Sequence, residues 1–163
     1  VDIDDRPTVI RYSKDPIPDD IRIVTSHDGL DVLCDGPEDG ILLVAHGQLC
    51  AEALAAVDQL DSPVRVVSPR WSLPVCGGLI EEAARARAVV SVEDGLVVSG
   101  LGSHLADALS QRGMWRPIRS LGIPQRYLDH DSRSAIMAEL GLDSRGIADA
   151  VSQLVAQLDG EYS

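Results

Sequence analysis

Two neighbouring carboxylates, Glu93 and Asp94, directly follow the short apolar run 89–92. Paired carboxylates can serve as general acid and general base when their surroundings drive their pKa values apart. An acid at the end of a strand can also hydrogen-bond the backbone amides of the next loop and fix its shape. We favour this second role, in which Glu93 and Asp94 shape the loop over residues 95–103 or lie at an interface.

Glycines in that loop raise the question of a phosphate site. Gly95, Gly100 and Gly102 stand between the apolar run and an amphipathic segment that begins at Gly102. The dinucleotide fingerprint GxGxxG would need a third glycine at position 105, where the chain has Leu105. We therefore expect Gly100 and Gly102 to be loop-shaping or interface positions, not part of a nucleotide site.

Arg70 and Trp71 follow another apolar run, residues 64–67. Arg70 could reach an anion at the crevice where strands end. Alternatively, it could pair with a carboxylate across a domain or dimer boundary, since Arg and Trp are enriched at interfaces. We favour the interface role for Arg70 and Trp71.

Other catalytic or metal-binding patterns do not stand out. No two histidines share metal-ligand spacing with an acid, no CxxC pair occurs, and no GxSxG string is present. We expect no metal site and no catalytic residue in this chain, and buried free thiols in a reducing compartment. The histidines and cysteines considered as metal ligands or nucleophiles are His27, His46, His104, His130, Cys34, Cys50 and Cys76.

Strands alternating with helices must position these groups. Strong strands are expected at 41–45, 64–67 and 89–92, and weaker ones at 8–12, 30–34 and 117–121. Helices are expected at 48–60, 75–87 and 102–111, followed by two C-terminal helices that end near 140 and 158. Residues 13–29 are expected to be a linker. The alternation predicts an α/β fold with βαβ units and a mostly parallel sheet.

Composition narrows the possible partners. The chain has 163 residues and a formal net charge of −12, which argues against nucleic acid or an anionic membrane as partner. No apolar stretch reaches spanning length and no signal peptide is seen, so a cytoplasmic protein is expected. The first residue is Val, which suggests a piece excised from a longer protein.

Four strings, in this order, resemble the C-terminal part of the 1-deoxy-D-xylulose-5-phosphate synthase family, in its actinobacterial form. They are IRYSKD (10–15), VVSPRWSLPV (66–75), VSVEDGLVVSGLGSHLADAL (90–109) and LGIPQRYLDHDSRSAIMAELGLD (121–143). The resemblance covers nearly the whole chain.

The resemblance implies a three-layer α/β/α domain with a five-stranded, mostly parallel mixed sheet, like a transketolase C-terminal domain, over residues 30–163. Residues 1–29 would be a remnant of the pyrimidine-binding middle domain plus a linker. Such synthases join pyruvate to glyceraldehyde 3-phosphate with loss of CO₂, and their product feeds isoprenoid, thiamine and pyridoxal synthesis. Their thiamine diphosphate and Mg²⁺ are held by domains outside this chain. The fragment itself would be an inactive scaffold and dimerisation domain that packs on the remaining domains, in a homodimer.

The resemblance also implies a role for two basic residues. Arg11 and Lys14 match the family string R-[YF]-x-[KR], whose last position binds the substrate phosphate in the intact enzyme. Many relatives have Arg where this chain has Lys14, and lysine offers a point charge instead of a fork. The alternative is a solvated pair of linker residues.

Two other functions stay open. The chain could be a freestanding α/β module that binds a small anionic metabolite through the loops near Glu93, Gly102 and Arg70. It could also be the C-terminal domain of a transketolase or of a dehydrogenase E1 β subunit, although the strings LGIPQRYLDH and AELGLD argue against this.

Overall fold

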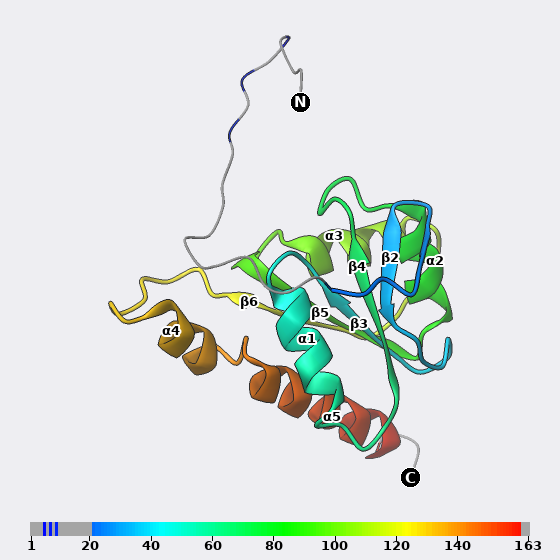
Figure 1. Cartoon of the computed structure of the whole chain (residues 1–163). Helices are drawn as coiled ribbons and strands as arrows, with labels where there is room; N and C mark the ends of the chain where they lie inside the picture. The colour runs from blue at the N-terminus through cyan, green and yellow to red at the C-terminus, as the bar shows by residue number, and fades with distance from the viewer. Residues whose placement is uncertain (1–4, 6, 8, 10–20, 161–163) are drawn as a thin grey trace.

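A six-stranded sheet is the central layer of the protein, whose computed structural model describes residues 5, 7, 9 and 21–160 (Figure 1). The strand order is β1-β2-β4-β3-β5-β6. β3 to β6 run parallel to one another, and β2 pairs antiparallel with both β4 and β1. The strands are β1 (Thr25–His27), β2 (Leu30–Cys34), β3 (Ile41–Ala45), β4 (Val64–Pro69), β5 (Ala88–Leu96) and β6 (Ile118–Ile123).

The α/β class and the mostly parallel sheet are confirmed, but the expected strand count of five is wrong. The additional strand is β1, which lies in the segment expected to be a linker. Asp28 and Gly29 both have positive φ, 40° and 77°, and turn β1 back onto β2. An Asp-Gly pair is a strong hairpin signal. The exposed residues of β1 lack the apolar alternation by which strands are recognised.

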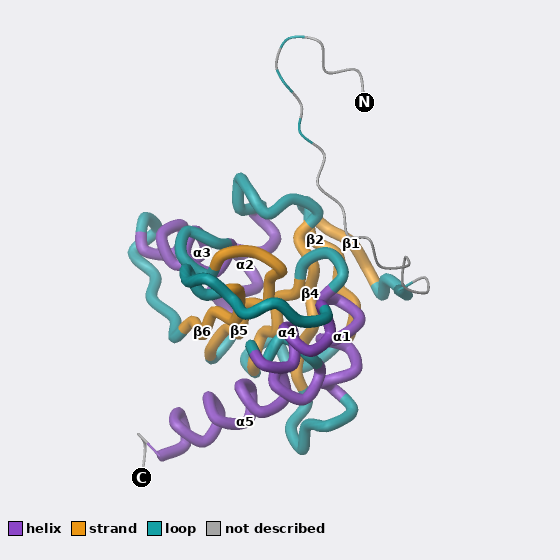
Figure 2. Tube along the Cα trace, turned by 90° about the vertical axis from the view of Figure 1, so that its left-hand side faces the viewer, coloured by secondary structure: helices purple, strands orange, loops and turns teal. Residues whose placement is uncertain are grey.

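Helices cover both faces of the sheet and complete the expected three layers (Figure 2). One face is covered by α1 (Leu49–Val57), α4 (Arg133–Glu139) and α5 (Ser144–Gly160). The other is covered by α2 (Gly77–Arg85) and α3 (Leu101–Ser110). None of the helices within the described residues is long and apolar enough to cross a membrane.

Alternate residues of β3 fill two separate cores. Leu43 and Ala45 pack toward α1 and α5, whereas Leu42 and Val44 pack toward α2 and α3. A strand buried on both faces is a continuous apolar run, as expected for a parallel sheet covered by helices. This explains why ILLVA, residues 41–45, was the strongest strand signal in the sequence.

β5 is longer than the sequence predicts, and it is bulged. Val92 pairs with Leu121 and Leu96 with Ile123, so residues 93–95 oppose Gly122 alone. Glu93 and Asp94, expected at the end of the strand, therefore lie within it. Bulges bend a strand and redirect its side chains.

The N-terminal predictions fall on residues that the structure does not describe. Arg11, Lys14 and most of the strand expected over residues 8–12 lie outside the described residues.

Candidate functional site

The carboxyl ends of the parallel strands gather the side chains singled out in the sequence. Arg70 and Trp71 follow β4, Glu93 and Asp94 lie in the last part of β5, and Gly100 immediately precedes α3. Parallel strands place their carboxyl ends at one edge of a sheet, where the ligand crevices of open α/β sheets also lie. We call this side of the molecule the carboxyl edge.

The Glu93 carboxylate lies against the N-terminus of α3. Gly100 is the N-cap of that helix, and a Cβ at this position would overlap the carboxylate. The Oε1 atom of Glu93 is buried and has no hydrogen-bond partner within the described residues. A negative charge at this point is favoured by the helix dipole. Glu93 therefore already supplies the anion that a helix N-terminus attracts.

Gly102 allows α3 to pack closely against the sheet. A Cβ there would overlap the hydroxyl oxygens of Ser91 on β5 and Ser120 on β6. Ser91 is fully buried, and its hydroxyl has no partner within the part of the chain that the structure describes. Gly102 is thus required for space, not for a left-handed backbone.

Asp94 points to a different helix. Its Oδ2 accepts a hydrogen bond of 2.8 Å from Nη2 of Arg133, the first residue of α4. The preceding Ser132 caps that helix by accepting a hydrogen bond from the amide of Ala135. The β5 bulge thus ties α3 and α4 to the same strand end.

Arg70 and Trp71 differ in their surroundings. Nη2 of Arg70 lies 3.4 Å from Oδ1 of Asp31 on β2, so Arg70 has a carboxylate partner inside the chain. Trp71 remains 69% exposed.

Further exposed apolar side chains lie at or after the ends of β4, β5 and β6 and were not singled out in the sequence. Large exposed apolar groups in the segments that follow successive strands could have been the signal. Each of them is at least half exposed, and we call this set the carboxyl-edge patch: Trp71, Leu73, Leu96, Val98 and Tyr127. Several large apolar groups exposed on one side of a protein make that side a candidate interaction surface.

A buried ionic cluster between β4 and α2 was also missed. Glu82 is 2% exposed, and its carboxylate accepts hydrogen bonds from Nε and Nη2 of Arg65, at 3.0 and 3.2 Å. His27 Nε2 and Arg85 Nη2 each lie 3.3 Å from Oε1 of Glu82, and Arg65 also bonds Asp35. Burial alone would lower the pKa of the Arg65 guanidinium, but its bonds to Glu82 and Asp35 outweigh this and raise the pKa. The signal was an arginine inside the apolar strand VRVV, residues 64–67.

The positions of the histidines and cysteines give little support for metal binding or thiol chemistry. No group of three or more His, Cys, Asp or Glu residues that could hold a metal ion occurs within residues 21–160. Cys50 is buried as expected, and burial raises the pKa of its thiol, whereas Cys34 and Cys76 are only half-buried. His46, at the end of β3, contacts the carbonyl oxygen of Pro69 through Nδ1 at 3.2 Å.

Residues 31–147 match the family described as "Transketolase, C-terminal domain". The chain belongs to this family. The transketolase C-terminal domain accounts for the strand alternation and for the three-layer architecture.

Actinobacterial proteins resemble this transketolase C-terminal domain along its whole length. The "1-deoxy-D-xylulose-5-phosphate synthase 2" of Streptomyces avermitilis is 43% identical over 99% of the chain. The "1-deoxy-D-xylulose-5-phosphate synthase" of a Mycobacterium species is 40% identical over 97% of it. The chain spans only 26% of the length of each of these relatives.

Solved structures show the same fold. One is described as "Split gene transketolase, inactive beta4 tetramer", where beta4 denotes the subunits. It superposes with a TM-score of 0.66 and 29% identity over 80% of this chain and 42% of that one. A transketolase from Campylobacter jejuni superposes with a TM-score of 0.55 and 16% identity over 81% of this chain and 20% of that one, which supports the fold alone.

Proposed function

We propose that this chain is the C-terminal domain of a 1-deoxy-D-xylulose-5-phosphate synthase, which joins pyruvate to glyceraldehyde 3-phosphate with loss of CO₂. The observation that carries the proposal is the 40–43% identity to synthases of this name over nearly the whole chain. Thiamine diphosphate and Mg²⁺, which this family uses, are assigned to the other domains of the parent protein.

The role we assign to the domain is docking and scaffolding at the carboxyl edge. The carboxyl-edge patch would pack against the remaining domains or against the second subunit of a homodimer. Trp71 and the neighbouring Arg70 would make the main contacts with that partner surface. Glu93, Asp94, Gly100 and Gly102 support this surface by fixing the positions of α3 and α4. The patch has the aromatic character of interaction surfaces.

The N-terminal residues connect this domain to its parent. We assign residues 1–29 to the end of the pyrimidine-binding domain and its linker, and residues 30–163 to the C-terminal domain. Lys14, with Arg11, would bind the substrate phosphate in the intact enzyme. We expect the parent enzyme to act in the cytoplasm.

A freestanding anion-binding module is less well supported. That function would use the N-terminus of α3 and Arg70 as anion-binding groups. The Glu93 carboxylate lies at the first, and Arg70 is paired with Asp31. A phosphate there would meet a fixed negative charge.

Two measurements on the purified chain test the proposal. Incubated with pyruvate, glyceraldehyde 3-phosphate, thiamine diphosphate and Mg²⁺, it should form no 1-deoxy-D-xylulose 5-phosphate, and sustained turnover would overturn the scaffold role. Light scattering should show self-association that Trp71→Asp weakens and that Ala55→Asp, at an exposed position on α1, does not. A strict monomer at high concentration would contradict the homodimer.

A further inference from the structure

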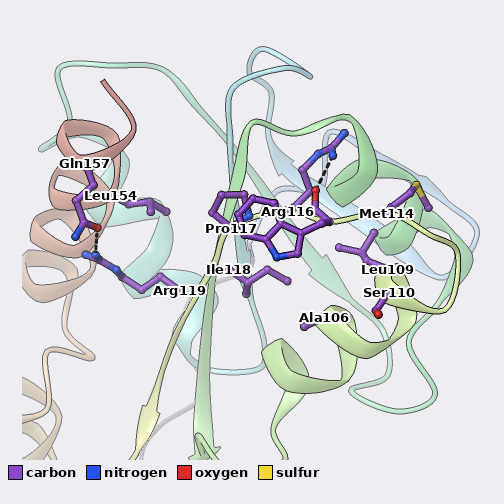
Figure 3. A pocket seen from close by; sticks show the side chains of 11 residues that line it. Ala106, Leu109, Ser110, Met114, Arg116, Pro117, Ile118, Arg119, Leu154 and Gln157 are labelled. Atoms are coloured by element: carbon purple, nitrogen blue, oxygen red, sulfur yellow. Dashed lines mark hydrogen bonds between the residues drawn. The ribbon is translucent and has the colours of Figure 1, made fainter. Parts of the chain in front are cut away.

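A pocket lies at the opposite end of the sheet from the carboxyl-edge patch. It has a volume of about 530 Å³ and is found where β6 begins, at the outer edge of the sheet. Figure 3 shows Leu154 and Gln157 of α5 on one side, Leu109 of α3 on the other, and Ile118 of β6 between them. A volume of this size is typical of small-molecule sites.

The charge of this pocket is unusual for so acidic a chain. Its lining contains Arg116 and Arg119 and no acidic residue, although the chain has a net charge of −12. Neither arginine has a carboxylate within ion-pair distance among the described residues, whereas Arg65 and Arg133 are paired with acids. Of the arginines that the structure describes as at least half-buried, only these two lack a carboxylate partner, and both line the pocket.

Arg119 donates its side-chain hydrogen bonds to uncharged acceptors, which an anion can replace. Its Nη1 donates to the carbonyl oxygen of Ala150 and to Oε1 of Gln153, at 3.1 and 3.3 Å, and its Nη2 donates to Oε1 of Gln157, at 2.5 Å. Gln153 and Gln157 are exposed. Hydrogen bonds to a charged oxygen are about twice as strong as bonds between neutral groups. An anion can therefore replace a glutamine amide at Arg119 with a net gain.

Arg116 has a structural role and adds positive charge. Its Nε donates to the carbonyl oxygen of Ala86 at 2.9 Å, and its Nη2 bonds the carbonyl of Ala84, so it covers the end of α2. The neighbouring Trp115 lines the pocket and is 76% exposed. A flat apolar group can stack on this ring beside the two cations.

We propose that this pocket binds a small organic anion with a flat apolar body. Its anionic group, a carboxylate, sulfonate or phosphate, bonds Arg119, and its apolar part lies on Trp115, Leu109 and Leu154. This site is separate from the docking surface of the proposed function and does not depend on it.

A matched pair of dyes tests the charge requirement. The chain contains two tryptophans, so Trp71→Phe leaves Trp115 as the sole energy donor. At low salt, 1-anilinonaphthalene-8-sulfonate should accept energy from Trp115 and bind about tenfold more tightly than N-phenyl-1-naphthylamine, which has the same rings without the sulfonate. Arg119→Gln should abolish this preference, and Arg119→Lys should restore part of it.

Two further variants separate a built site from a general apolar surface. Gln157→Ala should tighten binding of the sulfonate about twofold or more, because it removes a competing acceptor from Arg119. Arg112→Gln is the control. Arg112 is an exposed residue just after α3 whose side chain bonds only the carbonyl oxygen of Ala108, so its substitution should leave the affinity for the sulfonate unchanged. Unchanged unfolding midpoints will show that the variants are folded.

Three results would overturn the proposal. They are equal affinity for the two dyes, sulfonate affinity unaffected by Arg119→Gln, and sulfonate binding that weakens as the protein concentration rises. The last result would show that a second copy of the chain covers the pocket.

Discussion

At the scale of single residues, Glu82 is the centre of a buried ionic cluster. Its buried carboxylate meets Arg65 on two nitrogens and also lies close to His27 and Arg85. Three separate elements, β1, β4 and α2, therefore depend on one side chain. Removing one partner of a buried ion pair leaves an uncompensated charge, which costs far more than losing a surface pair.

Glu82→Gln should lower the free energy of unfolding by about 3–5 kcal/mol, because it leaves Arg65 buried without its main counter-charge. Urea unfolding followed by circular dichroism will measure this loss. Glu81→Gln, at the exposed neighbouring position, is the matched control and should stay within about 0.5 kcal/mol of the parent chain. Equal effects of the two changes would contradict the role of Glu82.

Cys50 should make stability depend on pH in the alkaline range. Burial raises the pKa of its thiol, so the folded state holds the proton at pH values where the unfolded chain has lost it. Its contribution is fully present below the unfolded pKa and is lost as pH rises toward the folded one.

The stability advantage of the parent chain over Cys50→Ala should therefore shrink above about pH 9, by at most about 1.4 kcal/mol per pH unit. Urea unfolding of both proteins at several pH values measures the difference. Cys34→Ala, at a half-buried thiol, is the control. A difference that is constant from pH 7 to pH 10 would contradict the assignment.

At the scale of elements, the contact of α3 with the sheet is set by the absence of a side chain at Gly102. Helix α3 itself is predicted well by the sequence, because Leu105 and Leu109 repeat at helical spacing. The extension of β5 through Glu93 and Asp94 could not be predicted in this way. Its register depends on a bulge opposite Gly122, which is a tertiary feature.

Gly102→Ala should cost about 1–3 kcal/mol of unfolding free energy, because its Cβ overlaps the hydroxyls of Ser91 and Ser120. Ser91→Ala alone should be neutral or stabilising, since that buried hydroxyl has no partner within the described residues. In the Ser91→Ala, Ser120→Ala background the cost of Gly102→Ala should fall by at least about half. If Gly102→Ala costs the same unfolding free energy in the parent chain and in this background, space at Gly102 is not the constraint.

At the scale of the whole molecule, the two ends of the sheet carry different surfaces. The carboxyl edge has exposed apolar groups, among them Trp71, and the opposite end has the pocket with Arg116 and Arg119. The α/β class and the mostly parallel sheet follow from local periodicity, and the three layers follow from the family resemblance. The hairpin strand β1 is marked by the local Asp28-Gly29 turn, but its exposed residues lack the apolar alternation of a strand. The carboxyl-edge patch and the Arg65–Glu82 cluster do not follow from local sequence, because each depends on residues that only the folded chain brings together.

The central claim is that this domain completes a 1-deoxy-D-xylulose-5-phosphate synthase. The most direct test replaces the matching C-terminal quarter of the Streptomyces avermitilis relative with this chain and measures product formation from pyruvate and glyceraldehyde 3-phosphate. We predict product at a rate within about tenfold of the unaltered synthase, a loss of about 1.4 kcal/mol or less in the activation barrier. A folded, correctly assembled chimera that forms no product would contradict the account.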